Sequence, residues 1–465
     1  MAAVRPGAVL RFVGLFLTLV GLLGHFYWAI SGGLVREGHW VGMDFHVYYQ
    51  AALVLRRGED IYHAGISPLY VYPPTLAVLV VPLSFLQADH ATILWKLSQY
   101  ACLMLAGVLL VNLLPPRARP LVGGLLMLGW LTSPFRDEVH FGESNSLVLA
   151  LVVGSVWLIA RTQSEQPARI RLSLALAGFL LALAVSIKVL PVLLVALLWW
   201  RGPRVVAAAA TGGFALLQLL TLAVVPATAY YWLVEFPGLF GQAFPFPDNQ
   251  SLNAVIARAL LPTDPTQPPT QLADGAAVRP VLTWAANLTV LAAAAWVLWS
   301  SRRVTTAHDY AGRNIGLLLQ VGLVLLTTHL VSGSTWVHHL VALSVPITGL
   351  VGAWWLAWSD WSTHRCLPTS DTPAHAAGDG HPEGRLKGSE AGTVGLALLL
   401  GGAYGLLLWR PSEWWAVAGQ LAYGNALLAL IASSMATWVV IALWLAVAFT
   451  LRRMGRVGST PNNGG

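Results

Sequence analysis

The sequence predicts an all-α, polytopic membrane protein, and three observations support this fold class. Hydrophobic residues make up 56% of the 465-residue chain. Charged residues make up only 10%, whereas an average soluble domain carries roughly 25%. Long apolar runs recur along the chain, and the basic residues collect at one set of their ends. This combination is typical of a bundle of membrane-spanning helices.

About twelve apolar runs are candidates for transmembrane helices. They lie at about 8–30, 91–114, 120–135, 146–160, 172–187, 189–200, 205–225, 281–300, 314–331, 337–358, 393–409 and 427–450. The first is too long for a signal-peptide core, so we expect an uncleaved helix. Several others are shorter than the ~20 residues that a helix needs to cross the hydrocarbon. A proline break or a re-entrant pair around Lys188 and Pro191 would remove a crossing or two.

The distribution of charge predicts the orientation. With the amino terminus in the cytoplasm, most of the 27 Lys and Arg residues fall on the inner side and most acidic residues outside. This positive-inside bias predicts a multi-pass protein of the cell (plasma) membrane with both termini cytoplasmic. It also accounts for the net charge of +7, so nucleic acid is not an expected partner. The two cysteines, Cys102 and Cys366, support neither a disulfide framework nor a cysteine-based metal site.

The chain divides into three predicted parts: a transmembrane region over 1–361 with outer loops 31–90 and 226–280, a linker over 362–391, and C-terminal transmembrane helices with a short basic tail over 392–465. The first outer loop contains a candidate amphipathic helix at 45–57 and a re-entrant or shallow helix at 75–86. The linker is rich in His, Gly, Pro, Asp and Ser, a composition that favours a disordered cytoplasmic segment.

Asp44 is the first candidate functional residue. It follows the first apolar run directly and precedes a short helix-like segment. An ionisable side chain at the mouth of a helix bundle is a candidate for function. The alternative is that Asp44 only caps a helix beginning at Phe45, because Asp is a preferred N-cap residue.

Lys188 and a histidine pair are further candidates on the same side. Lys188 lies deep in apolar sequence, where a lipid-linked phosphate would compensate for its charge; the alternative is snorkelling to the headgroups. His338 and His339 are adjacent, and adjacent helical positions point about 100° apart. We therefore expect one to face a cavity and the other to be structural. A helical zinc pair is normally four residues apart, which disfavours a metal site.

Two short segments allow more than one interpretation. Arg136-Asp137-Glu138 is interpreted as a solvated, salt-bridged turn, whereas Asn145 lies closer to the next helix and remains a candidate. Asn249-Gln250-Ser251 matches an N-glycosylation sequon, a short pattern with a high chance rate. We favour a turn that contacts substrate.

These segments together resemble glycosyltransferase family 87, the polyprenol-phosphate-mannose-dependent mannosyltransferases of the GT-C superfamily. The resemblance lies in Asp44-Phe45-x-x-Tyr48-Tyr49-x-Ala51-Ala52, Gly58-x-Asp60-x-Tyr62, Tyr72-Pro73-Pro74, Pro82-Leu83, Gly142-x-x-Asn145, Lys188-Val-x-Pro191, Asn249-Gln250-Ser251-Leu252 and Ser334-x-Trp336-x-His338-His339. It spans roughly residues 40 to 350. Where such relatives usually have Gly-Gln-x-Asn, this chain has Gly142-Glu143-Ser144-Asn145.

The resemblance implies a GT-C-type bundle that transfers a hexose, typically mannose, with inversion. The donor would be a polyprenyl-phosphate sugar and the acceptor a hydroxyl of a glycolipid or polysaccharide, at a site on the outer face among membrane lipids. Asp44 matches the acid that serves as general base in such enzymes, and Lys188 with His338 or His339 would bind the donor phosphate. The remaining implied substrate contacts are Tyr48, Tyr49, Tyr72, Asn145, Asn249, Gln250 and Trp336.

No pair of aspartates suited to a divalent metal accompanies these motifs, so we expect neither a metal nor another cofactor. A second hypothesis is a transporter of lipids or lipid-linked sugars that uses Asp44, Lys188 and the histidines as a substrate or proton pathway. A transporter should place its charges near the bilayer midplane, whereas these lie at one face, and no internal repeat is evident. A structural scaffold is the third possibility, which the same one-sided clustering disfavours.

Overall fold

The computed structural model describes residues 6–29, 42–162, 167–239, 244–260, 278–302, 310–365, 382–421 and 426–457. Within these ranges the secondary structure is helical, apart from one isolated bridge between Asn249 and Trp336. The helices of the first half are α1 (Pro6–Trp28), α2 (Met43–Arg56), α3 (Pro74–Val80), η2 (Val81–Phe85), α4 (Ala88–Asn112), α5 (Arg119–Gly129), α6 (Ser133–Phe141), α7 (Asn145–Arg161), α8 (Pro167–Ile187), α9 (Val192–Arg201) and α10 (Arg204–Val224). Those of the second half are α11 (Thr228–Tyr230), η4 (Tyr231–Glu235), α12 (Phe236–Gly238), α13 (Leu252–Leu260), α14 (Val278–Ser300), α15 (Tyr310–Val331), η6 (Val337–Leu343), α16 (Ser344–Arg365), α17 (Pro382–Leu407), α18 (Pro411–Leu421), α19 (Ala426–Ser433) and α20 (Met435–Val457).

The predicted membrane bundle is confirmed, but the predicted count of about twelve spans is not confirmed. Eight helices among the described residues are long and apolar enough to cross a membrane, or up to ten if two bent pairs each form one span. The runs expected at 120–135 and 189–200 form α5 and α9, with 11 and 10 residues. At ~1.5 Å per residue, such helices are about half as long as the ~30 Å hydrocarbon core. Both are therefore too short to span alone.

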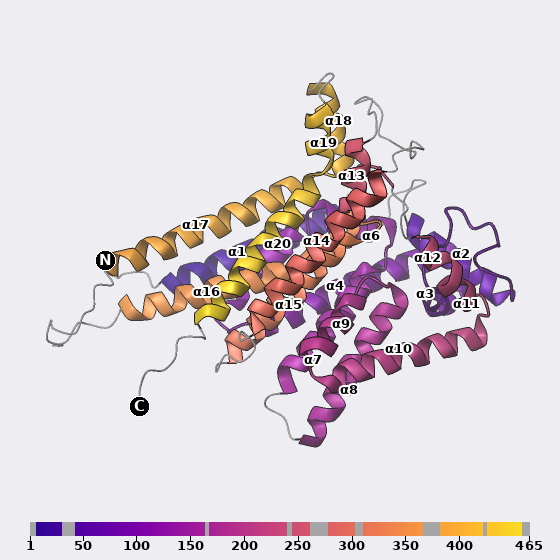
Figure 1. Cartoon of the computed structure of the whole chain (residues 1–465), viewed down its shortest axis with the longest axis horizontal. Coiled ribbons are helices and arrows are strands. Elements are labelled where there is room, and N and C mark those ends of the chain that lie inside the picture. The colour runs from indigo at the N-terminus through magenta and orange to yellow at the C-terminus, as the bar shows by residue number, and fades with distance from the viewer. Residues whose placement is uncertain are drawn as a thin grey trace.

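Helix α15 lies among the long helices of the bundle, as Figure 1 shows. Most of its side chains are buried. Helices α14, α16 and α20 pack against it, while α4, α7, α8 and α10 form the adjoining part of the bundle. Large apolar side chains are exposed along α1, α10 and α14. In a membrane bundle such faces contact lipid, because lipid tails accept apolar surface at no cost. The long helices therefore carry the apolar exterior, and the polar groups are left to the interior and the ends.

The two helices predicted in the first loop are present. The amphipathic helix expected at 45–57 is α2, and the shallow helix expected at 75–86 is the α3–η2 pair. Helix α2 begins at Met43 with Gly42 as its N-cap, and no side chain caps it. The N-cap interpretation of Asp44 is therefore wrong: the residue lies inside the first turn of α2.

Two breaks between helices create the polar end of the bundle. Helices α6 and α7 meet at an angle of 115° across residues 142–144. Gly142 has a positive φ of 70°, and a Cβ there would lie 2.9 Å from Cβ of Phe45, so α2 packs directly on the bend. Helix α8 ends at Ile187 and α9 begins after Pro191, which leaves Lys188 at a break. We call this part of the molecule the site end.

Parts of the predicted loops and linker lie outside the described residues: 31–41 of the first loop, 240–243 and 261–277 of the second, and 366–381 of the linker. The flanks of the predicted linker are helical, because α16 continues to Arg365 and α17 begins at Pro382. The outer loop predicted at 226–280 contains the short helices α11, η4, α12 and α13.

Candidate active site

The carboxylate of Asp44 is half-buried at the site end, in the first turn of α2. Among the described residues it forms no hydrogen bond or ion pair. Tyr48 lies four positions later, and residues four apart share one face of a helix. Asp44 therefore faces the same direction as Tyr48, toward the interior of the site end.

Glu143 is the centre of a buried polar cluster. It lies in the bend between α6 and α7, and only 1% of its surface is exposed. Its carboxylate accepts hydrogen bonds from Tyr48 Oη at 2.8 Å and from Tyr72 Oη at 3.2 Å. It also accepts a bond from Lys188 Nζ at 2.9 Å. The carboxylate is thus paired and multiply bonded, which is what a buried charge requires. We call Glu143, Tyr48, Tyr72, Lys188, Asn145, Glu138, His338 and His339 the Glu143 cluster.

Lys188 holds the ammonium of this cluster. Besides Glu143, its Nζ donates to Asn145 Oδ1 at 2.7 Å and lies 3.4 Å from His339 Nε2. The ammonium also lies 5.3 Å from the ring centroid of Tyr72, within cation–π range. Lys188 is only 6% exposed, so it does not snorkel. The break between α8 and α9 directs its side chain into the bundle.

Asn145 and Glu138 connect this cluster to the start of α7. Asn145 Nδ2 donates to Glu138 Oε2 at 2.8 Å, while its Oδ1 receives the bond from Lys188. The other carboxylate oxygen of Glu138 accepts the amide of Ser146 at 2.6 Å. A carboxylate at the first turn of a helix is favoured by the helix dipole. Asn145 is therefore oriented at both ends, and it positions the Lys188 ammonium.

The interpretation of Arg136-Asp137-Glu138 as a solvated turn is wrong. Glu138 is fully buried in the cluster, and Asp137 is 5% exposed and paired with Arg410 Nη2 at 2.5 Å. Sequence reasoning also missed Glu143 as a central residue. The available signal was an acidic residue in the short segment between two apolar runs, where a side chain must lie close to the ends of both helices.

Both histidines reach the cluster, which corrects the expectation that only one would. His338 Nε2 lies 3.0 Å from Glu143 Oε1, and His339 Nε2 lies near Lys188 as described above. Their ring centroids are 4.9 Å apart at an interplanar angle of 76°. The expectation assumed an α-helix, whereas η6 is a 3-10 helix wedged against α6, α7 and α15. Residues of neighbouring elements therefore lie close to both rings: Glu143 to His338 and Lys188 to His339.

Four of the residues predicted to contact substrate lie outside the Glu143 cluster. Tyr49 Oη donates to the carbonyl of Leu86 at 2.7 Å. The Asn249 amide bonds to backbone groups of Phe244 and Thr335, and the Gln250 amide bonds to backbone groups of Ser433 and Thr437. Trp336 pairs with Asn249 in the isolated bridge, and its ring lies 6.1 Å from that of Phe246. The interpretation of 249–251 as a substrate-contacting turn is therefore not supported, because both amides are used to anchor the chain.

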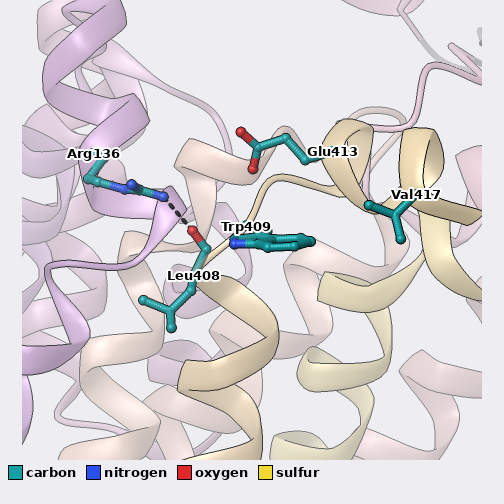
Figure 2. A pocket seen from close by; sticks show the side chains of 5 residues that line it. All are labelled: Arg136, Leu408, Trp409, Glu413 and Val417. Atoms are coloured by element: carbon teal, nitrogen blue, oxygen red, sulfur yellow. Dashed lines mark hydrogen bonds between the residues drawn. The ribbon is translucent and has the colours of Figure 1, made fainter.

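A separate cavity of about 520 Å³ lies between α6 and the bend that joins α17 to α18. It is lined by Arg136, Leu408, Trp409, Glu413 and Val417, as Figure 2 shows. Arg136 donates a hydrogen bond to the carbonyl of Leu408 across one side of it. None of these five residues belongs to the Glu143 cluster, although α6 contributes to both.

The surroundings of Asp44 change its acidity. Burial, together with the nearby negative charge of Glu143, raises the pKa of Asp44 to about 7, against the opposing effects of His338 and Lys188. Burial also holds the pKa values of Tyr48 and Tyr72 well above the ordinary value, so both phenols stay protonated and donate. The site end thus presents an unpaired carboxylate of near-neutral pKa beside the buried Lys188–Glu143 ion pair. A general base works best with a pKa close to the operating pH.

Glu143, His338 and His339 each place one potential ligand atom within 4.8 Å of the others, so these three side chains could approach a metal ion. The Lys188 ammonium, however, lies 2.9 Å from Glu143 and 3.4 Å from His339. A divalent ion bound among the three residues would be repelled by that charge at short range. The lysine thus supplies the cation that pairs with Glu143.

A bundle of apolar helices with a buried charged cluster and a free carboxylate at one end defines a multi-pass membrane protein with a polar reaction or binding site. The sequence model of glycosyltransferase family 87 matches residues 70–328, which is more than half of the chain. The chain therefore belongs to glycosyltransferase family 87 and is a membrane glycosyltransferase. This match confirms the resemblance found in the sequence.

Among curated proteins, none matches the chain in sequence. Solved structures give distant likenesses. ArnT from Cupriavidus metallidurans bound to undecaprenyl phosphate is 13% identical with a TM-score of 0.42, over 95% of this chain and 77% of that one. The apo oligosaccharyltransferase of Archaeoglobus fulgidus is 11% identical with a TM-score of 0.41, over 92% of this chain and 56% of that one.

Proposed function

We propose that this glycosyltransferase transfers a hexose, specifically mannose, from a polyprenyl-phosphate donor to an acceptor hydroxyl, with inversion and with Asp44 as general base. The observation that carries the proposal is the unpaired, half-buried Asp44 carboxylate beside the buried Lys188 and histidines. The Asp44 carboxylate is suited to removing a proton, and Lys188 and the histidines are suited to stabilising a phosphate.

The chemistry follows from these two features. Asp44 removes the proton of the acceptor hydroxyl as the oxygen attacks the anomeric carbon from the face opposite the phosphate. The bond between that carbon and the phosphate oxygen breaks, and its electron pair leaves with the phosphate. Because the leaving group is itself an anion, the reaction needs cationic donors rather than a second catalytic acid. Lys188 and His338 are placed to stabilise the charge that develops on the phosphate.

The location of the site supports a lipid-linked donor. Asp44 and the Glu143 cluster lie at one end of the bundle, where α6 bends into α7, α8 ends at a break and η6 packs against α6 and α7. We place this end on the outer face and both termini in the cytoplasm, because that orientation puts most basic residues inside. The Lys188 ammonium supplies the cation at the site, so we propose that transfer needs no metal or other cofactor. Glycolipid or polysaccharide hydroxyls are the proposed acceptors.

The test is transfer of radiolabelled mannose from polyprenyl-phosphate-mannose to a panel of lipid acceptors, in membranes that contain wild type or Asp44→Asn at matched expression. The matched control is Asp89→Asn, because Asp89 is also in the first turn of a helix but is exposed. We expect Asp44→Asn to insert normally and to lose transfer by about two to four orders of magnitude, the scale of a general base. Asp89→Asn should retain the wild-type rate.

The stereochemistry of the product tests the inversion. Replacing the mannosyl donor with a polyprenyl phosphate that carries another sugar tests the specificity for mannose. Nuclear magnetic resonance of the product should show the anomeric configuration opposite to that of the donor. Equal transfer by wild type and Asp44→Asn would refute the base assignment. No label with any protein, across a broad set of acceptors and donor sugars, would favour the transporter hypothesis instead.

A further inference from the structure

Glu143 places a negative charge where a donor phosphate would bind. Its carboxylate is held by one ammonium and two phenols, and an imidazole nitrogen lies 3.0 Å away. These donors are also the groups that suit a phosphate oxygen. A phosphate bound to Lys188 and His338, as the proposed function requires, would therefore share its cations with Glu143 and lie close to it.

The phosphate changes its charge during the proposed transfer. The donor is a phosphodiester with one negative charge. When the carbon–oxygen bond breaks, the phosphate keeps the electron pair and becomes a monoester with two negative charges, while the acceptor proton moves to Asp44. The second pKa of a phosphate monoester is about 6, so at neutral pH the dianion predominates. Product and donor thus differ by one full charge at the position next to Glu143.

The buried carboxylate of Glu143 repels the doubly charged product phosphate more strongly than the singly charged donor phosphate. Glu143 is 1% exposed, so its field is weakly screened by water. Lys188 carries one positive charge and Glu143 one negative charge, and the two are 2.9 Å apart. Their sum leaves little net charge to hold a dianion. The donor monoanion meets less repulsion from Glu143 than the product does, because repulsion scales with the charge on the phosphate.

We propose that Glu143 is a specificity-determining residue that disfavours the dianionic polyprenyl phosphate relative to the monoanionic donor, and so promotes release of the lipid product. This inference rests on the proposed function, because it requires a lipid-linked phosphate at Lys188. Glu143 acts through the charge of the site and does not touch the reacting carbon. In this role the negative charge of Glu143 offsets the positive charge of Lys188 while the bound phosphate carries only one negative charge.

A merely structural role for Glu143 predicts a different result. Glu143 also orients Tyr48, Tyr72 and Lys188, so any substitution will disturb the cluster. Loss of orientation should weaken donor and product binding by similar factors. Loss of the charge should change the ratio of the two affinities. The ratio is therefore the informative quantity, and not either affinity alone.

The experiment measures binding of undecaprenyl phosphate and of undecaprenyl-phosphate-mannose to the purified full-length protein in nanodiscs, without acceptor, at pH 8. Wild type is compared with Glu143→Gln, which removes the charge, and Glu143→Asp, which keeps it. We expect Glu143→Gln to shift the affinity ratio toward the monophosphate by about tenfold or more, the scale of one strong charge interaction. Glu143→Asp should keep the wild-type ratio even if both affinities fall. In turnover, Glu143→Gln should lower the multiple-turnover rate more than the single-turnover rate.

Three outcomes would overturn the inference. The first is a fall of both affinities by the same factor in Glu143→Gln, which would leave only the structural role. The second is the same change of ratio in Glu143→Asp as in Glu143→Gln, because the aspartate keeps the charge. The third is failure of both lipids to bind wild type above a phosphatidylglycerol control, which would refute the proposed function as well. The first two outcomes leave the proposed function intact.

Discussion

The Nζ atom of Lys188 lies 2.9 Å from Oε2 of Glu143, although the residues are 45 positions apart in the sequence. The contact joins the break between α8 and α9 to the bend between α6 and α7. Both side chains are almost fully buried. Each charge therefore needs the other, because an unpaired buried charge is strongly destabilising.

The first prediction separates the stabilising role of this pair from its catalytic one. Lys188→Met should lower the free energy of unfolding by about 3–5 kcal/mol, because it leaves the Glu143 carboxylate buried without its ammonium. The double variant Lys188→Met with Glu143→Gln should recover much of this loss, because neither charge remains. Both variants should lose mannose transfer. Thermal unfolding in detergent and the transfer assay measure the two effects, and additive losses of stability in the double variant would contradict the pairing.

The second prediction concerns pH. The pKa of Asp44 is raised to about 7, and a general base acts only in its deprotonated form. The value of kcat/KM should therefore rise as pH increases through about 7. An aspartate with an ordinary pKa would give a rise near pH 4.

The charged groups around Asp44 are Glu143, His338, Lys188 and Glu138. A histidine that must be protonated to bind phosphate would make activity fall as pH rises through its pKa. The measurement is the pH–rate profile of wild type between pH 5 and 9. A profile that is flat, or that falls across this range, would contradict Asp44 as the base.

The third prediction concerns the bend that carries Glu143. Gly142→Ala places a side chain on a backbone with a φ of 70° and brings its Cβ to 2.9 Å from Cβ of Phe45. The positive φ alone costs about 1–2 kcal/mol. The control is Gly65→Ala, which has a φ of 71° but no neighbouring atom within 4 Å of the added Cβ.

We expect Gly142→Ala to lower the melting temperature more than Gly65→Ala does, and to reduce transfer because it displaces Glu143 relative to α2. The difference between the two variants isolates the contact with Phe45, because both share the backbone strain. Equal losses of stability would show that α2 does not pack closely on the bend.

The fourth prediction concerns metal ions. Because Lys188 already supplies the cation beside Glu143 and His339, treatment with EDTA or 1,10-phenanthroline should leave the transfer rate within about twofold of its value. The assay is run on the same membranes before and after dialysis against the chelator. Loss of activity that is restored by adding a divalent metal would instead assign Glu143, His338 and His339 as ligands.

The fold class could be predicted from the sequence because a long apolar segment has few structural solutions in lipid, and a helix is the main one. The same reasoning located α2 and the α3–η2 pair from local patterns. Its count of about twelve spans is not confirmed, since an apolar run does not reveal where a helix bends, as at Gly142.

The candidate site was predicted only in part. Asp44, Lys188, Asn145 and the histidines were recognised because polar groups are conspicuous in apolar sequence. Glu138 was not, because it was interpreted as part of a solvated turn, and Glu143 stood out only as a departure from the Gly-Gln-x-Asn pattern. Asn249 and Gln250 were assigned to substrate, whereas their amides bond to distant backbone groups.

Local sequence patterns thus determined that this chain is a helical membrane protein and which polar side chains are unusual in it. The tertiary structure decided which of those side chains meet. Lys188 and His339 are 151 residues apart, and they approach because a broken helix, a 115° bend and a 3-10 helix converge at one end of the bundle. Periodicity reports the faces of a single helix and carries no information on contacts between distant ones.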